Sequence, residues 1–364
     1  MKYLNEYRDP ELAKQYLEEI KKTVTQPWSI MEVCGGQTHS LVKNGIIDML
    51  PKEVTMIHGP GCPVCVTPLN LIDKAIHLAL NENVILCSFG DMLRVPGSKI
   101  NLLEAKAKGG DIRVLYSPLE AVKIAADNPN REVVFFAVGF ETTAPANALS
   151  VIHAHRRKLN NYSILASHVL VPPAIKAVID DEESKIDGFL AAGHVCTIMG
   201  NSEYYPIAKK HEVPIVVTGF EPLDVLQGIL MVIRQLEANK SIVENQYSRI
   251  VREDGNTAAQ KIIFEVFEIS NQMWRGIGEI PESGYAIKEK YIAFDASRKF
   301  DISIEEAPEH PECISGQIMK GIKKPFECPQ FGKKCKPSFP LGAPMVSSEG
   351  ACAAYYHFSG LIET

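Results

Sequence analysis

The stretch VVFFAVGFETTAPANAL, residues 133–149, begins with an uninterrupted apolar run, turns at Gly-Phe-Glu and continues as a helix-compatible segment. An apolar run of this length predicts a strand that is buried on both faces. The stretch PIVVTGFEPLDVLQGIL, residues 214–230, repeats the same order, and ILCSFGD, residues 85–91, is a fainter relative. The repeat indicates either a recurrent strand-to-helix turn or two duplicated α/β halves.

Short apolar runs of this kind recur along the chain up to about residue 240. Eight of them are predicted as strands, at residues 29–33, 54–57, 84–89, 112–116, 133–138, 163–167, 188–192 and 214–218. Helix-compatible segments lie between most of these runs, and buried strands that alternate with helices are typical of a mainly parallel α/β sheet. We therefore predict an α/β fold with two similar, mainly parallel α/β domains and a loop-rich C-terminal domain that contains helices.

Helix signals and changes of pattern give the expected borders. Asp9-Pro10 caps a helix predicted over 11–24, and the pairs Thr67-Pro68 and Ser117-Pro118 can cap the helices that follow them. A further helix is predicted over 260–274. The predicted units are an N-terminal helix at 1–27 that packs on the C-terminal domain, α/β domains at 28–130 and 131–245, and the C-terminal domain at 246–364.

Composition narrows the class of protein. The chain has 364 residues, of which 46% are hydrophobic, and its formal net charge of −6 argues against a nucleic-acid binder. We see no apolar run long enough to span a bilayer, and the N-terminal sequence is charged throughout, unlike a signal peptide. We therefore expect a cytoplasmic protein. Nine cysteines in that reducing compartment indicate metal binding or redox chemistry more than a disulfide framework.

The first notable cysteine, Cys34, lies in MEVCGGQTHS, residues 31–40, where an apolar run meets a Gly-Gly turn. Ligand sites in open α/β sheets gather at the carboxyl ends of strands. A thiol at the start of the following helix is expected to have a lowered pKa, because the helix dipole favours the thiolate. The alternative is that Cys34 is a small buried hydrophobe.

The pair Cys62 and Cys65 lies in GPGCPVCVTP, residues 59–68. A C-x-x-C that follows a strand and precedes a helix is the arrangement of a redox pair, with the pKa of the first thiol depressed. A zinc half-site would need two further ligands, which Cys34, His39 and His58 could supply. The motif alone leaves the redox pair, the zinc clip and coincidence open.

Four further cysteines crowd the C-terminal region with the spacing C-x14-C-x6-C-x16-C. They can close a tetrahedral zinc site or a [4Fe-4S] site, and the lack of paired C-x2-C knuckles favours iron–sulfur. The four are Cys313, Cys328, Cys335 and Cys352. By contrast, Cys87 and Cys196 lie in or next to apolar runs without partner spacing, so we expect both to be structural.

In combination these motifs resemble a known family. MEVCGGQTH, GPGCPVCVTP, FAVGFETTAP, AAGHV and the C-x14-C-x6-C-x16-C spacing occur in this order between about residues 29 and 352. They closely resemble the HypD family of [NiFe]-hydrogenase maturation factors, which assemble the Fe(CN)2CO unit. No key cysteine departs from the pattern.

The resemblance implies roles for individual residues. Cys34 would be the thiolate that binds the transient iron of Fe(CN)2CO, and Cys62 and Cys65 would be a redox-active pair between that iron and a [4Fe-4S] cluster. The cluster would be held by Cys313, Cys328, Cys335 and Cys352. The residues expected to line the central cleft are His39, Glu141, Thr142 and Thr143.

The resemblance also implies partners. These are a HypC-type chaperone that shares the iron and a HypE-type donor of cyanide, which the HypE–HypF pathway makes, while the free protein is expected to be monomeric. The protein would then be a redox-active assembly scaffold more than a conventional turnover enzyme. Two other functions remain open: an iron–sulfur-dependent reductase of a protein or small-molecule disulfide, and a zinc-stabilised α/β binding protein.

Overall fold

The computed structural model describes residues 6–302, 304 and 307–360. All eight predicted strands are present, each within three residues of its expected ends. They are β1 Trp28–Glu32, β2 Val54–His58, β3 Val84–Ser88, β4 Asp111–Val114, β5 Glu132–Gly139, β6 Tyr162–His168, β7 Gly188–Ala192 and β8 Ile215–Thr218. The apolar runs form strands because both of their faces are buried: every residue of β3, β7 and β8 is buried.

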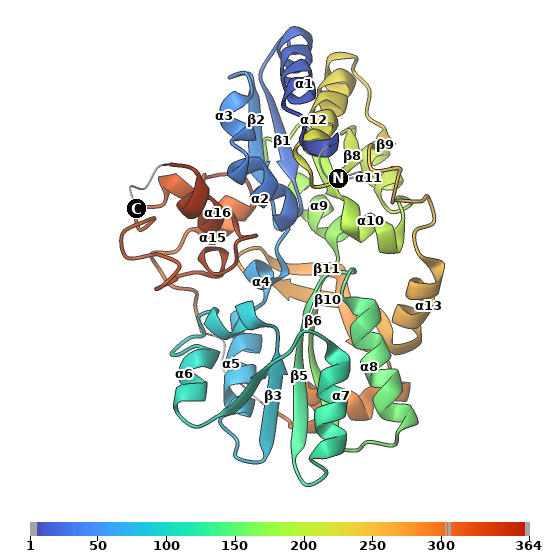
Figure 1. Ribbon diagram of the computed structural model, residues 1–364, viewed down its shortest axis with the longest axis vertical. Helices are drawn as coiled ribbons and strands as arrows, with labels where there is room; N and C mark the ends of the chain where they lie inside the picture. The colour runs from blue at the N-terminus through green and yellow to red at the C-terminus, as the bar shows by residue number, and fades with distance from the viewer. Residues whose placement is uncertain (1–5, 303, 305–306, 361–364) are drawn as a thin grey trace.

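The strands form two parallel sheets, one in each lobe of the molecule (Figure 1). The first sheet has the order β2-β1-β7-β8-β9, in which β9 is Val243–Asn245, and the second has the order β4-β3-β5-β6. This pairing divides the chain differently from the predicted borders at 28–130 and 131–245. Strand β3 pairs with β4 and β5, and β1 pairs with β2 and β7, because the chain leaves the first sheet after β2 and returns to it at β7.

Helices cover the sheets of both lobes. Around the first sheet lie α1 Pro10–Thr23, α2 Gly35–Lys43, α3 Ile46–Met49, α9 Val171–Ile179, α10 Gly193–Met199, α11 Tyr204–His211 and α12 Pro222–Glu237. Around the second lie α5 Leu69–Ala79, α6 Leu102–Ala107, α7 Pro118–Asp127 and α8 Ala144–Arg156. The alternation of strand and helix puts the apolar side of each helix on a sheet, which is why both sheets are parallel.

The N-terminal helix begins as predicted but packs elsewhere. The Asp9 carboxylate accepts hydrogen bonds from the N–H groups of Glu11 and Leu12, and Pro10 is the first helical residue. Helix α1 packs on α12 of the first lobe, with Ile20 fully buried between them. The prediction that this helix packs on the C-terminal domain is therefore wrong.

Two of the chain crossings between the lobes and a hairpin form the waist. The first crossing contains α4 Pro63–Val66, and the second leads from β6 into α9. The hairpin of β10 Phe267–Trp274 and β11 Gly278–Ile287 contacts both β6 and α9. The predicted helix at 260–274 is only half correct, since α13 Thr257–Val266 ends where β10 begins. The remaining residues form a strand because they pair with β11.

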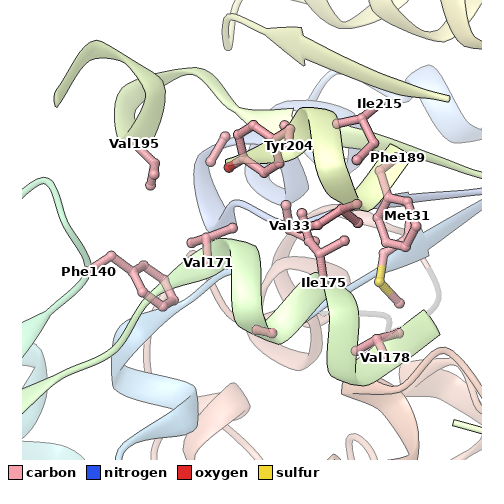
Figure 2. Packing of buried hydrophobic residues seen from close by; sticks show 14 of the residues in the cluster. Met31, Val33, Phe140, Val171, Ile175, Val178, Phe189, Val195, Tyr204 and Ile215 are labelled. Carbon is pink, nitrogen blue, oxygen red and sulfur yellow. The ribbon is translucent and has the colours of Figure 1, made fainter. Parts of the chain in front are cut away.

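A shared apolar core fills the waist. Figure 2 shows Met31 and Phe189 from the first sheet, Val171 and Ile175 from α9, and Phe140 from the turn after β5 in one cluster. The lobes are therefore packed against each other through side chains from both.

The C-terminal segment lies beside the waist (Figure 1). Its helices are α15 Ser315–Met319 and α16 Ala351–Phe358, and α16 packs on α2 of the first lobe, whereas the preceding α14 Ala296–Lys299 packs on β6 of the second. Short 3-10 helices occur at Glu6–Arg8, Gly90–Arg94, Glu289–Phe294, Pro325–Glu327 and Ala343–Met345. Among the described helices, none combines the length and the apolar character needed to cross a membrane.

Candidate functional site

Cys34 lies where the strand order of the first sheet reverses. Strand β1 lies between β2 and β7. The connection after β1 leads to β2 on one side, and the connection after β7 leads to β8 on the other side. Cys34 lies two residues after the end of β1 and is the N-cap residue of α2. A topological switch point of this kind is where open α/β sheets bind ligands, so the predicted position of Cys34 at a strand's carboxyl end is confirmed.

The Cys34 turn and the C-x-x-C loop contact each other directly. The N–H of Gly35 donates a hydrogen bond of 2.8 Å to the carbonyl oxygen of Gly61. A Cβ atom at Gly61 would lie only 2.2 Å from the backbone nitrogen of Cys34, so only glycine allows this approach. Two motifs that are 25 residues apart in sequence, at 34–36 and 59–65, therefore form one structural unit.

The Cys34 thiol itself has a raised pKa, contrary to the prediction of a lowered one. Burial is the main cause and raises the pKa to about 12, and the carboxylates of Glu349 and Glu32 add to the effect. The N–H groups of Gly36 and Gln37 lower the pKa, as expected at a helix start, but by less. Burial therefore favours the neutral Cys34 thiol, and metal binding would displace its proton.

Cys62 and Cys65 are free thiols buried in the first crossing. Cys62 is the N-cap residue of α4, and the N–H of Cys65 donates to the Cys62 carbonyl oxygen at 3.0 Å. Their exposed fractions are 4% and 3%. Burial and the neighbouring Cys62 thiol raise the pKa of Cys65 well above its usual value. Thr67 does not cap α5 as predicted, because its hydroxyl donates to the Pro63 carbonyl oxygen instead.

The GFETT turn follows β5 and meets the second crossing. Glu141 is 1% exposed, and its Oε1 accepts a 2.9 Å hydrogen bond from the Val171 N–H, while Oε2 is buried with no partner among the described residues. Burial raises the pKa of Glu141 to about 8. Thr142 is exposed, and the Thr143 hydroxyl donates to the Phe140 carbonyl oxygen. Glu141 thus lies inside the waist and fixes the start of α9.

His39 lies on α2 and faces the C-terminal segment. Its Nδ1 is 3.4 Å from the Ser348 carbonyl oxygen, and its ring packs edge-on against Phe358 with 5.2 Å between centroids. Since α2 begins at the residue after Cys34, His39 connects this helix to α16.

The four C-terminal cysteines line a single small cavity of about 20 Å³. The remaining lining is mainly apolar, with Ile314, Ile318, Phe331, Leu341 and Met345 among its residues. The Leu341 N–H donates to the Cys335 Sγ at 3.4 Å, and a Cβ at Gly342 would lie 2.4 Å from the Cys313 Sγ. The sequence prediction that these cysteines act together therefore gains support from their position.

The four cysteines carry the donor atoms that an iron–sulfur cluster binds. No group of three or more His, Cys, Asp or Glu side chains within the described residues is placed to hold one metal ion. A cubane cluster binds each thiolate to a different iron atom, so its ligands surround a volume and do not converge on a point. Burial raises the pKa of Cys352 well above its usual value, and its three cysteine neighbours raise it further. A positively charged group between the thiols would relieve this repulsion.

A larger cavity of about 570 Å³ lies at the carboxyl edge of the second sheet. Its walls include Pro63 and Val64 of α4, Thr143 after β5, and the segment 347–349 that precedes Cys352. The second sheet also reverses its strand order here, between β3 and β5. The C-x-x-C helix thus separates the thiol site of the first lobe from a cavity of the second.

Glu32 and Tyr355, which the sequence analysis did not single out, join Cys34 through His58 to the C-terminal segment. Buried Glu32 accepts the Cys34 N–H at 2.9 Å, and its other oxygen lies 2.7 Å from His58 Nδ1. The Nε2 of His58 lies 3.2 Å from the Tyr355 hydroxyl on α16. No local pattern predicts this chain, because His58 and Tyr355 are 297 residues apart.

Gln37 is another missed residue at this edge. Its side-chain amide donates to the Ala191 carbonyl oxygen at 3.0 Å and to the Thr218 hydroxyl at 2.6 Å. It thereby holds the start of α2 against the carboxyl ends of β7 and β8. Only the position of Gln37 three residues after Cys34 could have indicated such a role.

Taken together, the fold and the site define a parallel α/β protein that brings three cysteine thiols and a four-cysteine cavity to one waist. A family model named HypD and described as "Hydrogenase formation hypA family" matches residues 11–359. The chain is 47% identical to the hydrogenase maturation factor HypD of Rhodobacter capsulatus, over 99% of both chains. It is 46% identical to HypD2 of Bradyrhizobium diazoefficiens, over 98% of this chain and 97% of that one, and 43% identical to HypD of Escherichia coli, over 98% of both. The chain therefore belongs to the HypD family of hydrogenase maturation factors, and the resemblance is confirmed.

Proposed function

We propose that this chain is the scaffold on which the Fe(CN)2CO unit of a [NiFe]-hydrogenase is assembled. Cys34 binds the iron, which is shared with a HypC-type chaperone and receives cyanide from a HypE-type donor. Cys313, Cys328, Cys335 and Cys352 hold a [4Fe-4S] cluster. The observation that carries the proposal is the hydrogen bond from Gly35 to Gly61, which joins the Cys34 turn to the C-x-x-C loop.

The chemistry of the residues supports these roles. Iron that carries cyanide and carbon monoxide is electron-rich and soft, so a thiolate such as that of Cys34 suits it as a ligand. When bound, the cluster would supply or accept single electrons. Cys62 and Cys65 can store a pair of electrons, because closing their disulfide releases two electrons and two protons. Their burial keeps this exchange away from solvent thiols.

The alternative function, reduction of an external disulfide, is less well supported. A disulfide reductase needs an attacking sulfur that its substrate can reach. Cys62 and Cys65 are 4% and 3% exposed, so an external disulfide does not reach either sulfur in this conformation. Access is better at Cys34, which is half-buried, and this difference favours Cys34 as the residue that meets the cargo.

Metal analysis tests the proposal directly. The full chain is purified without oxygen, and iron, acid-labile sulfide and zinc are measured together with Mössbauer spectra. We expect about four cluster irons and about four sulfides per chain, lost in Cys328→Ala and retained in Cys34→Ala and Cys62→Ala. These last two variants should nevertheless abolish hydrogenase maturation in cells.

Two outcomes would contradict the proposal. Zinc without sulfide in the purified chain would exclude the cluster and return the C-x-x-C to a possible zinc clip. Loss of the cluster in Cys34→Ala would show that Cys34 does not belong to a separate site.

A further inference from the structure

The second Gly-Phe-Glu turn, residues 219–221, has no role in the proposed function. It follows β8 at the same carboxyl edge of the first sheet from which Cys34 emerges, with β7 between β1 and β8. Its phenylalanine, Phe220, is half-buried, whereas most apolar residues of β8 are fully buried. Phe220 thus leaves part of its ring open at the edge of the sheet from which Cys34 emerges.

Phe220 and Cys34 border the same space. A Cβ atom at Gly36 would lie 2.8 Å from Phe220 Cδ1 and 3.8 Å from Cys34 Sγ. The ring and the sulfur are thus both within 4 Å of one point on the first turn of α2. A group bound to the sulfur on the Gly36 side would approach the phenyl ring, and glycine at position 36 is what allows the ring to come so close to α2.

The ring is held on both sides by other aromatic groups. Phe220 stacks on His194, with 3.8 Å between centroids and 28° between planes, and meets Tyr247 edge-on at 6.2 Å. Tyr247 in turn lies under the guanidinium of Arg249 at 4.4 Å. Arg249 is fixed by two hydrogen bonds to buried Asp224. The position of Phe220 is therefore set by a connected set of contacts and not by its own turn alone.

His194, which stacks on Phe220, follows β7, the strand across the switch point from β1. His194 is the second residue after β7. The residue before it, Gly193, leaves room for Tyr247, because a Cβ atom at position 193 would lie 2.8 Å from Tyr247 Cδ1. In the described structure the His194 ring makes no hydrogen bond or ion pair, and it stacks on the Phe220 ring. His194 is thus a positioning residue for the ring.

We propose that Phe220 is the specificity wall of the Cys34 site. On its side of the sulfur it excludes water, admits small ligands with few heavy atoms and hinders bulky thiol-reactive molecules. The role of Phe220 toward an iron cargo rests on the proposed function. Linear ligands such as cyanide are small enough to pass the Phe220 ring. The steric part concerns the thiol alone and can be tested without iron.

The test compares a small and a bulky alkylating reagent on the full chain without oxygen. Iodoacetamide and N-(1-pyrenyl)maleimide are reacted separately, and modification of Cys34 is followed by peptide mass spectrometry with Cys34→Ser as the blank. Phe220→Ala should speed modification by the maleimide by about tenfold or more, equivalent to about 1.4 kcal/mol in the barrier, and change the iodoacetamide rate far less. His194→Ala, which releases the ring without removing it, should give a smaller change in the same direction.

Matched controls separate the effect of removing the Phe220 ring from a general loosening of the fold. Phe264→Ala removes the same ring from α13, which packs on α8, and should leave both rates unchanged. Equal maleimide rates in the wild-type chain, Phe220→Ala and His194→Ala would overturn the inference, provided that circular dichroism shows folded variants. If the alkylation result holds but Cys34→Ala fails to block maturation, the wall stands and the iron-binding proposal falls. The two failures are therefore distinct.

Discussion

The two Gly-Phe-Glu turns share a local sequence but differ in what surrounds them. Each joins a strand to a helix that has proline in its first turn, α8 in one lobe and α12 in the other. In the first turn Phe140 is 6% exposed and packs on Trp274 of the hairpin, and Glu141 is buried. In the second, Phe220 and Glu221 are both partly exposed. The local sequence thus determines the backbone path, while the neighbouring elements determine whether the side chains support the core or face a site.

The largest expected difference concerns the two phenylalanines. Phe140→Ala should lower the free energy of unfolding by about 3–5 kcal/mol, because it removes a ring from the shared core of the waist. Phe220→Ala should cost about 1 kcal/mol, because part of its ring is already in solvent. Urea unfolding of both variants, followed by circular dichroism, measures the contrast. Equal losses would mean that the second turn belongs to the core as much as the first.

The strands could be predicted from the sequence, whereas their partners could not. Runs such as 84–89 and 188–192 are mostly apolar, so each signals burial on two faces. The same property makes them interchangeable in sequence, and nothing local says that β1 pairs with β7 and not with β3. The hairpin was missed for a related reason. Residues 267–274 form a strand only because β11 lies beside them, and this contact depends on distant residues.

The parts of the candidate site that lie in a sequence motif could be predicted. The contacts between residues that are distant in sequence could not. The turn after Cys34 and the C-x-x-C were visible as thiols beside glycines at strand ends. Their contact through Gly61 could not be predicted, because it depends on how the first crossing folds back. The pKa of Cys34 was predicted with the wrong sign, since sequence indicates a helix start but not the burial that outweighs it.

The second prediction compares the two glutamates of the turns. Glu141→Ala leaves the buried Val171 N–H without its acceptor and opens a cavity, so we expect a loss of about 2–4 kcal/mol in unfolding free energy. Glu141→Gln keeps the shape and the acceptor and should cost much less. Chemical unfolding of the pair tests whether the hydrogen bond to α9 carries the effect. A Gln variant as unstable as the Ala variant would contradict it.

The third prediction concerns pH, on which the two turns should again differ. The pKa of Glu141 is about 8 in the folded protein and near 4.5 when unfolded, so the folded state holds the extra proton between these values. Stability therefore falls as pH rises through this window, by up to about 1.4 kcal/mol per pH unit. Glu141→Gln has no carboxyl proton to lose at this position, so its stability should not fall over this pH range.

Unfolding midpoints at about pH 5, 6.5 and 8 for the wild-type chain and Glu141→Gln measure this slope. The two curves should diverge toward alkaline pH, with the Gln variant gaining relative stability. Parallel curves would mean that Glu141 titrates normally and is hydrated in solution. Glu221→Gln is the control from the other turn, and its curve should follow that of the wild-type chain.

The smallest effect is expected at Glu221 itself. Its carboxylate bonds Arg8 through two hydrogen bonds of 2.5 and 3.0 Å, and this exposed pair joins the segment before α1 to the start of α12. Glu221→Gln should lower the unfolding midpoint slightly in dilute buffer and not at all in about 1 M salt, because salt screens exposed charges. A loss that persists in salt would show that the second turn, like the first, depends on a carboxylate shielded from solvent. The contrast between a structural glutamate and a surface one would then fail.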